Sequence, residues 1–317
     1  MRGCFATKVL KNQPLESIPK GKKVKLTDMG NIKEIMCIDK LSLDGFPVKK
    51  ISKTEYMVIA TGEVLEYQNK SENRSQNKDS LRKTFKKIRE LINTNFTGEK
   101  NELAFTITYK ENMTDSKVLY NDFKKFMMRL EYKYPNIEYI SVVEPQERGA
   151  WHCHILLKFM DLEKIYIPNK EINEMWGNGF VKVKAIKSNV DNLGAYLSAY
   201  LGDVPVDFDD QENIRELMDL GIIKVGQGIN IKEVEIQGQK KKFIKGGRLY
   251  LYPPGMNIYR ASRGIKQPKK DYMSYEEAKK IVGAGTPNYS TKIKIFDDND
   301  ICINSITYES YNSKRKS

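Results

Sequence analysis

Between residues 103 and 201 the sequence alternates between short stretches of strand character and longer stretches of helical periodicity. The predicted order is strand, helix, strand, strand, helix, strand and helix, over 103–109, 118–132, 139–144, 151–159, 169–176, 180–186 and 189–201. This order is typical of a split βαβ arrangement, in which an antiparallel sheet carries its helices on one face. We therefore predict an α+β fold with a central antiparallel sheet whose other face is open to a substrate, plus small β-rich flanking elements.

The flanking segments divide the chain into four predicted parts. A small β-rich element occupies 1–67, and the core domain occupies 68–202 and opens with a basic helix. A β-rich basic extension follows over 203–265, with strands predicted over 229–244 and 248–252. The last part, 266–317, is a tail with a helix over 275–281 and a hairpin over 292–308.

The chain contains two histidines, and both fall in the predicted strand 151–159. Alternate side chains of a strand point to the same face, so His152 and His154 lie side by side, while Cys153 points to the opposite face. A histidine taken singly is more often an ordinary surface residue. This spacing of the two histidines instead favours a shared role as metal ligands.

The preceding strand and turn supply an acidic partner for the imidazoles. If the two strands pair as a hairpin, Glu144 lies opposite His152 and Val142 lies opposite His154, all on one face. Glu144 is then the predicted third ligand, and Glu147, inside the turn, is the alternative. Such a site leaves coordination positions open and suits Mg²⁺ or Mn²⁺ acting on phosphate oxygens; Zn²⁺, Co²⁺ or Ni²⁺ would also bind in vitro.

The charge of the chain points to a polyanionic partner. Its 317 residues carry a formal net charge of +13, with the 40% hydrophobic and 10% aromatic residues of a globular protein. No stretch is apolar for long enough to span a membrane, so nucleic acid is the expected partner and a membrane is not. A lysine-rich proteome is the alternative source of the charge.

The cysteines and the first residues indicate a cytoplasmic protein. The 4 cysteines are scattered and form no CxxC pair, which favours reduced thiols over a disulfide framework or a zinc knuckle. Residues 1–8 lack the apolar core of a signal peptide.

Basic residues that suit phosphate binding occur in several predicted elements. The helix 81–93 has an apolar stripe on one side and lysines and arginines on the others, which is also how an ordinary solvated helix looks. Around 240–263, basic residues interleave with Tyr250, Tyr252 and Tyr259, as in a surface that stacks bases; the alternative is a hairpin with the tyrosines packed beneath it. The predicted DNA-binding residues are Arg74, Arg82, Lys83, Lys86, Lys87, Arg148, Lys182, Lys184, Lys241, Lys242 and Arg248.

The helix 189–201 carries a pair of tyrosines at helical spacing. Tyr196 and Tyr200 are four residues apart, so their hydroxyls emerge from one face of the helix about 5–6 Å apart. A tyrosine beside a metal that polarises a phosphodiester can attack phosphorus and hold the DNA end as a phosphotyrosine. Tyrosines at this spacing are most often packing residues, and the nearby histidine strand is what favours a catalytic role.

These motifs together resemble the HUH endonuclease superfamily, and within it the rolling-circle replication initiators (Rep proteins) of Gram-positive plasmids, phages and integrative elements. The resemblance covers about 67–265. It rests on the His-x-His strand, the downstream tyrosine helix and the Phe-Thr-Ile-Thr-Tyr strand. The segments most similar to that family are 72–75 (ENRS), 144–152 (EPQERGAWH), 194–197 (GAYL) and 248–255 (RLYLYPPG).

The resemblance implies a function for each of these parts. His152 and His154 would bind the metal with an acidic third ligand. A tyrosine, with Tyr196 favoured and Tyr200 in support, would nick one strand at the origin, leaving a 5′-phosphotyrosine and a free 3′-OH primer, and later rejoin the strand. The partner would be single-stranded or supercoiled origin DNA, often folded as a hairpin in small initiators. The chain has no GxxxxGK[ST] phosphate loop, so a bacterial host would supply helicase and polymerase.

One feature departs from the family pattern. Many relatives carry a lysine three residues after the nucleophile, whereas Ala199 and Asp203 occupy these positions here. Lys182, Lys184 or Lys187 would substitute, or the metal alone would stabilise the charge.

Two alternative functions remain at this point. The same chemistry would serve a conjugative relaxase or a single-strand transposase. A non-catalytic nucleic-acid-binding protein with an RRM-like sheet would instead stack bases on Phe105, Tyr109 and Trp151.

Overall fold

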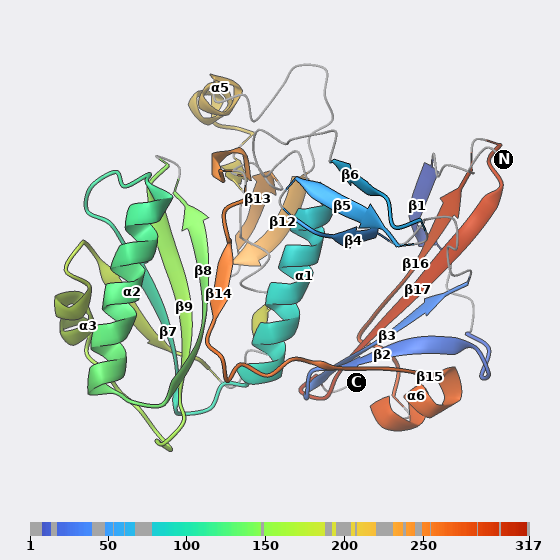
Figure 1. Ribbon diagram of the computed structural model, residues 1–317, viewed down its shortest axis with the longest axis horizontal. Coiled ribbons are helices and arrows are strands. Elements are labelled where there is room, and N and C mark those ends of the chain that lie inside the picture. Colours follow the sequence, from blue (N-terminus) through green and yellow to red (C-terminus); the bar gives the residue numbers. More distant parts are fainter. Residues whose placement is uncertain are drawn as a thin grey trace. The chain divides into compact units, whose positions relative to one another are not determined.

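The computed structural model describes residues 8–13, 18–39, 48–52, 54–59, 61–66, 78–146, 149–187, 192–194, 204–206, 208–219, 231–236, 239–244, 249–253, 255–283, 285–297 and 299–315. The chain divides into two compact units. The first unit combines Met1–Lys70 with Pro268–Ser317, and the second unit spans Ser71–Gln267 (Figure 1). The fold is mixed α/β with antiparallel sheets, which is compatible with the predicted α+β class. No helix of the described part is both long and apolar enough to cross a membrane.

A five-stranded antiparallel sheet forms the centre of the second unit. Its strand order is β10-β7-β9-β8-β14, so β9 lies between β7 and β8 although it follows both in the chain. The connection from β7 to β8 runs through helix α2, and the connection from β9 to β10 runs through α3. The bounds are β7 (Glu102–Thr108), α2 (Ser116–Lys133), β8 (Ile137–Pro145), β9 (Trp151–Phe159), α3 (Asn169–Trp176), β10 (Val181–Ala185) and β14 (Tyr259–Ala261).

Local sequence explains why α2 begins and packs where it does. The Asp115 side chain caps the helix by accepting hydrogen bonds from the backbone N–H groups of Lys117 at 2.7 Å and Val118 at 3.4 Å. The predicted apolar stripe is confirmed, because Leu119, Phe123, Phe126, Met127 and Leu130 are all buried. Rings from α2 and α3 meet the same sheet face: Phe123 lies 5.8 Å from Tyr139, and Trp176 lies 5.1 Å from Tyr109, centroid to centroid.

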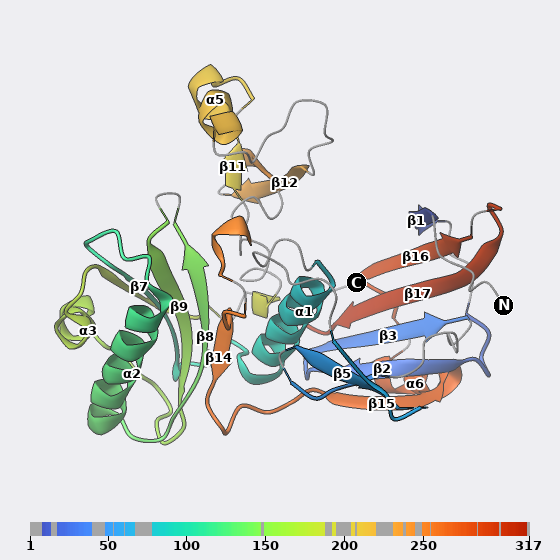
Figure 2. The ribbon, with the colours of Figure 1, turned by 45° about the horizontal axis from the view of Figure 1, so that its top comes forward.

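Helix α1 (Lys78–Asn95) lies on the opposite face of this sheet, which corrects the prediction that the helices cover one face. Figures 1 and 2 both show the sheet between α2 and α3 on one side and α1 on the other. Lys158, which points to the same face as the histidines, donates to the carbonyl oxygen of Asn95 at the end of α1, at 3.5 Å. The pattern of α1 alone does not say which face it covers, because a buried apolar stripe fits either.

The segment after the central sheet also differs from prediction. The predicted strand 248–252 contains a 3-10 turn at Leu249–Leu251 instead. Tyr252 is buried, and its hydroxyl donates to the carbonyl oxygen of Val143 at 2.8 Å, so this tyrosine packs beneath the surface and does not stack bases. A separate three-stranded sheet, in the order β11-β13-β12, contains β11 (Val204–Val206), β12 (Ile231–Ile236) and β13 (Gln239–Ile244), and α5 spans Gln211–Asp219.

The first unit is built from both ends of the chain. Its main sheet has the order β1-β16-β17-β3-β2-β15, so strands from the first forty residues pair with strands from the last fifty. The sequence-based division assigned these segments to separate parts at 1–67 and 266–317. The bounds are β1 (Lys8–Gln13), β2 (Lys23–Asp28), β3 (Ile32–Ile38), β15 (Lys269–Ser274), α6 (Tyr275–Val282), β16 (Tyr289–Phe296) and β17 (Cys302–Asn312); β4 (Val48–Lys50), β5 (Glu55–Val58) and β6 (Val64–Glu66) form a small second sheet.

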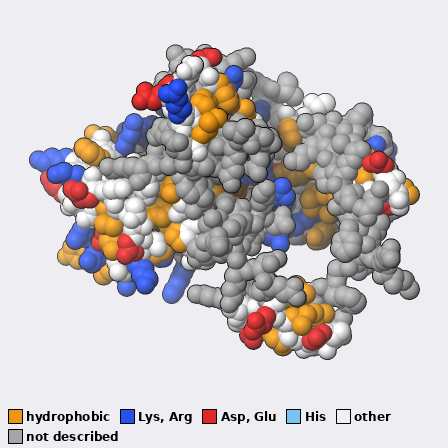
Figure 3. All heavy atoms as spheres, turned by 90° about the horizontal axis from the view of Figure 1, so that it is seen from above, with side chains coloured by type: hydrophobic (Ala, Val, Ile, Leu, Met, Phe, Trp, Pro, Cys, Tyr) orange, Lys and Arg blue, Asp and Glu red, His pale blue; other side chains and the backbone are white. Residues whose placement is uncertain are grey.

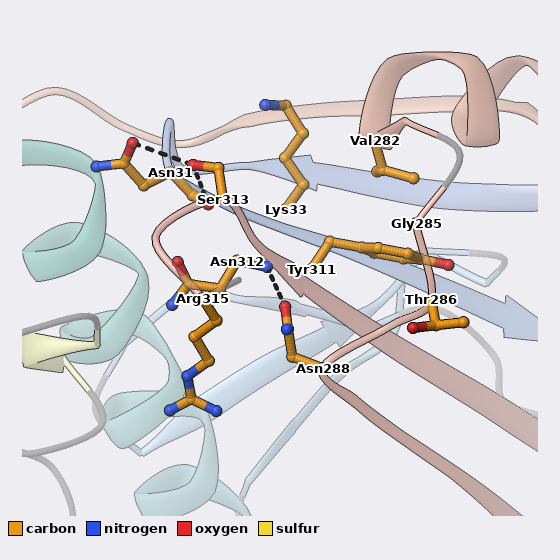
Figure 4. Close-up of a pocket in the computed structure, with 10 residues that line it drawn as sticks. All are labelled: Asn31, Lys33, Val282, Gly285, Thr286, Asn288, Tyr311, Asn312, Ser313 and Arg315. Carbon is orange, nitrogen blue, oxygen red and sulfur yellow. Dashed lines mark hydrogen bonds between the residues drawn. The ribbon is translucent and has the colours of Figure 1, made fainter. Parts of the chain in front are cut away.

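Two features of the first unit are local. Helix α6 starts with a capping box, in which Ser274 and Glu277 bond to each other's backbone N–H groups, and it helps bury a core that includes Val24, Leu26 and Ile35. A pocket of about 130 Å³ lies nearby (Figure 4). Its two cationic lining residues, Lys33 and Arg315, extend in opposite directions, so the pocket does not converge positive charge on one ligand.

Candidate functional site

Strands β8 and β9 bring Glu144, His152 and His154 together on one face of the central sheet. The predicted register is confirmed: Glu144 pairs with His152, and Val142 pairs with His154. The Nε2 atoms of the two imidazoles are 3.0 Å apart, and the Oε2 atom of Glu144 is 3.1 Å from His152 Nε2 and 3.2 Å from His154 Nε2. All three side chains are largely buried, with exposed fractions of 7% for Glu144, 13% for His152 and 27% for His154.

These three atoms fit the ligand set of a divalent metal ion. Ligands about 2.1 Å from an octahedral ion lie about 3.0 Å from their neighbours, close to the observed separations. One carboxylate and two imidazoles on one side of the ion would leave positions open for other ligands. Within the described part of the chain, this is a group of three potential ligands whose donor atoms all lie within 4.8 Å of one another.

The electrostatics of the cluster keep the Glu144 carboxylate ionised. Burial by itself would raise the pKa of this carboxyl group. Hydrogen bonds from His152 and His154, together with their positive charge, outweigh burial and lower the pKa to about 2. The oxygen that faces both imidazoles is therefore charged under physiological conditions and is ready to act as a ligand.

Strand β7 contributes a neighbour that sequence reasoning did not single out. Thr106 pairs directly with His154, and its Oγ1 lies 3.2 Å from His154 Nδ1. The residue lies in the predicted strand 103–109. The period-two pattern that aligned the histidines could have placed Thr106 on their face once the β7–β9 register was known.

The row of side chains continues onto the edge strand β10. Lys182 pairs with Thr106, so Lys182, Thr106 and His154 lie in one line across the sheet, and Lys184 pairs with Ala104 on the same face. Both lysines are exposed. The structure thus brings two of the predicted DNA-binding residues onto the metal-site face.

The segment leading to the predicted tyrosine helix docks on α1. Asn93 of α1 donates to Asn192 Oδ1 at 3.0 Å and accepts from the backbone N–H of Gly194 at 2.8 Å. A Cβ at position 194 would lie 2.5 Å from the Arg89 carbonyl oxygen, so the close approach requires glycine there. Tyr196 and Tyr200 themselves lie outside the described residues.

The other predicted site residues are dispersed. On α1, Arg82, Lys83 and Lys86 are exposed; Lys86 is 3.9 Å from Glu90, and Lys87 donates to Gln267. Lys242 is exposed, with its Nζ 5.7 Å from the centroid of the Phe208 ring. Glu147, Arg74, Arg148, Arg248 and the Lys241 side chain lie outside the described part. In the face shown by Figure 3, lysines and arginines are spread over several parts of the surface, including the end near α2 and α3.

The aromatic residues assigned to base stacking are not on the surface. Phe105, Tyr109 and Trp151 are 1%, 4% and 2% exposed and belong to the core between the sheet and its helices. Their burial removes the stacking platform that a non-catalytic RRM-like protein would need.

Comparison with known proteins supports a role in replication. Residues 102–204 match the family model of the replication-associated protein ORF2, and this region includes β7 to β10 and the Glu144–His152–His154 cluster. A search of curated proteins found no significant match. The match confirms the predicted resemblance to rolling-circle replication initiators at the level of the family. The central region of this chain therefore belongs to the replication-associated protein ORF2 family.

Proposed function

We propose that this protein initiates rolling-circle replication by nicking one DNA strand at an origin in a metal-dependent reaction. The observation that carries the proposal is the Glu144–His152–His154 triangle, with donor separations of 3.0 to 3.2 Å, inside a region that matches a replication-associated family. The net charge of +13 suits single-stranded or supercoiled origin DNA as the substrate. Helicase and polymerase would come from a bacterial host, in whose cytoplasm the protein would act.

The strand order supports the finer fold assignment. In the order β10-β7-β9-β8, each of the two βαβ-like connections skips one strand, as in the split βαβ arrangement. The histidines lie on the central strand β9, as in the HUH type of this arrangement. We propose that the second unit is an HUH-type nuclease core of the kind found in elements of Gram-positive bacteria.

The proposed metal is Mg²⁺ or Mn²⁺, held by His152, His154 and Glu144, with Glu147 as the alternative acidic ligand. When bound, such an ion would neutralise charge on the scissile phosphate and polarise it toward attack. Glu144 and the two imidazoles orient the open positions of the site toward the face that β7, β8 and β9 share.

The proposed nucleophile is Tyr196, with Tyr200 in support. The tyrosine oxygen forms a bond to phosphorus while the bond from phosphorus to the 3′ oxygen breaks, and the tyrosine proton ends on that 3′ oxygen by way of solvent. The products are a 5′-phosphotyrosine and a free 3′-OH, and the reverse reaction rejoins the strand without another energy source. The docking of Asn192 and Gly194 on α1, which lies on the histidine face, supports a tyrosine position near the metal site.

Lys182 is the proposed substitute for the lysine that this chain lacks near its tyrosines. It is exposed, it shares the sheet face of His154, and one residue, Thr106, lies between them in the cross-strand row. A cation there would stabilise the charge that develops on the phosphate during attack. Lys184 lies one row further from the histidines, so we expect it to bind flanking DNA backbone.

The decisive experiment incubates the protein with Mn²⁺ and a labelled oligonucleotide that carries a candidate origin. We expect a slower, protease-sensitive band on a denaturing gel, lost in the double variant Tyr196→Phe/Tyr200→Phe and in His154→Ala. The matched control is Tyr132→Phe, because Tyr132 is 93% exposed on α2, the helix of the opposite sheet face. If the double variant forms as much adduct as the parent, the tyrosine assignment is wrong.

Two further outcomes separate the alternatives. A relaxase or single-strand transposase would form the same adduct but cut at a transfer origin or an element end, so mapping the cut site distinguishes them. DNA binding that persists without any adduct, after chelation and after loss of both histidines, would indicate a binding protein without nuclease activity.

A further inference from the structure

The two histidines of the candidate metal site differ in what holds their second ring nitrogen. Thr106 Oγ1 lies 3.2 Å from His154 Nδ1. The Nδ1 atom of His152 is buried and has no hydrogen-bond partner among the described residues. The imidazoles are otherwise equivalent, since both Nε2 atoms face the same Glu144 oxygen.

Strand register explains the difference. Thr106 and Thr108 of β7 pair directly with His154 and His152, so each histidine has a threonine beside it on the same sheet face. The Thr108 hydroxyl, however, donates to the carbonyl oxygen of Phe180 at 3.2 Å, just before the edge strand β10. Thr106 has no such bond to β10 among those that the described residues show, and its hydroxyl oxygen instead meets the His154 ring.

The chemistry of a neutral imidazole gives this contact a consequence. To offer a lone pair at Nε2, His154 must carry its proton on Nδ1, and that N–H needs an acceptor in a partly buried site. The Thr106 oxygen provides it. Threonine is β-branched and held in a strand, so its hydroxyl has few alternative positions and fixes both the tautomer and the rotation of the ring.

We propose that Thr106 is a positioning residue that sets His154 in the tautomer required for metal binding, whereas His152 is oriented without such a partner. The proposal rests on the metal site put forward above, but it concerns the protein's own hydrogen bonding and can be measured without DNA and without metal.

The test uses three variants of the full chain. Thr106→Val removes the hydroxyl and keeps the branched shape, Thr106→Ser keeps the hydroxyl, and Thr108→Val is the matched control on the other histidine. The first readout is the ring-nitrogen NMR spectrum of the metal-free protein at about pH 8, where an ordinary imidazole is neutral. We expect His154 to be the Nδ1–H tautomer in the parent, in Thr106→Ser and in Thr108→Val, and to become a mixture of tautomers in Thr106→Val.

The second readout is the affinity for Mn²⁺ measured by calorimetry. Loss of a partner outside the direct ligands costs about 10–100-fold in metal affinity, and we expect Thr106→Val to weaken binding within that range. Thr106→Ser and Thr108→Val should stay within about threefold of the parent. Thermal melting checks that Thr106→Val remains folded.

The outcomes separate the two proposals. If the parent binds no metal but His154 shows the expected tautomer shift in Thr106→Val, the proposed metal function fails and the positioning contact stands. If the parent binds Mn²⁺ and Thr106→Val matches it in both affinity and tautomer, the positioning role of Thr106 is overturned and the metal site stands.

Discussion

At the scale of single residues, burial decides which chemical groups of this protein can react. The sheet separates two environments within three consecutive positions of β9. His152 and His154 face the metal site, while Cys153 points into the core between the sheet and α2. Burial of the Cys153 thiol raises its pKa to about 12 because the thiolate would be desolvated. A nucleophilic role for this cysteine next to the histidines is therefore not supported.

We predict that alkylation will distinguish the described cysteines. Cys302 is exposed, whereas Cys37 and Cys153 are buried. At about pH 8 the thiolate fraction of Cys153 is negligible, and it grows only as the pH rises toward the raised pKa. Iodoacetamide should label Cys302 within minutes and leave Cys153 unmodified until the protein is denatured, as read by peptide mass spectrometry. Rapid labelling of Cys153 in the folded protein would contradict its position in the core.

At the scale of elements, α1 connects the metal-site face to the segment that leads to the tyrosines. Asn93 bonds to both Asn192 and Gly194, and the Gly194 backbone approaches that of Arg89 closely. These contacts lie between α1 and 192–194 and involve none of the three candidate metal ligands. The element that orients the nucleophile and the hairpin that holds the metal can therefore be perturbed separately.

We predict that Gly194→Ala reduces adduct formation without reducing metal affinity. The new Cβ would lie 2.5 Å from the Arg89 carbonyl oxygen and 2.7 Å from Asn93 Oδ1, so the segment must move away from α1. Overpacking of this kind costs about 1–3 kcal/mol. The yield of covalent adduct should fall at least tenfold, while the Mn²⁺ affinity stays within about twofold of the parent.

Two further variants make that result interpretable. Asn93→Ala removes both side-chain bonds and should also lower the adduct yield. Gly21→Ala is the control, since a Cβ there meets nothing within 4 Å. Full adduct yield in both Gly194→Ala and Asn93→Ala would show that this docking does not position the tyrosines.

At the scale of the whole molecule, the two units differ in how the chain builds them. The second unit is continuous from Ser71 to Gln267 and contains the complete histidine hairpin. The first unit needs both chain ends, because β2 pairs with β15 and β3 pairs with β17 across more than 240 residues of sequence. Its stability depends on a closure that neither terminal segment can make alone.

We predict that deletions at the two ends have unequal effects. A fragment of residues 71–267 should bind Mn²⁺ with nearly the affinity of the full chain, because it keeps every strand of the central sheet. A fragment of residues 1–267 lacks β15, β16 and β17, so residues 8–39 should become sensitive to protease while the second unit stays resistant. Mass spectrometry of limited digests measures this. Protection of residues 8–39 in the fragment 1–267 would show that the N-terminal strands fold without the C-terminal ones.

The candidate site was predicted from sequence as far as local geometry determines it. Alternation along a strand places His152 and His154 on one face. The short turn at 146–150 then limits the hairpin to a register that pairs Glu144 with His152. The α2 stripe is equally local. Thr106, by contrast, could not be chosen over Thr108, because the two differ only in the contact of Thr108 with Phe180 on a separate segment.

The sequence by itself therefore determined the order of elements, the faces of their side chains and the metal-binding hairpin, because these depend on the pleat, the helical period and a turn of a few residues. The tertiary structure alone decided which sheet face α1 covers, where 192–194 docks, and that the two chain ends share one sheet. Those arrangements depend on contacts between residues far apart in the chain. Many partners satisfy the same apolar pattern, and the choice among them is made only when the elements pack together.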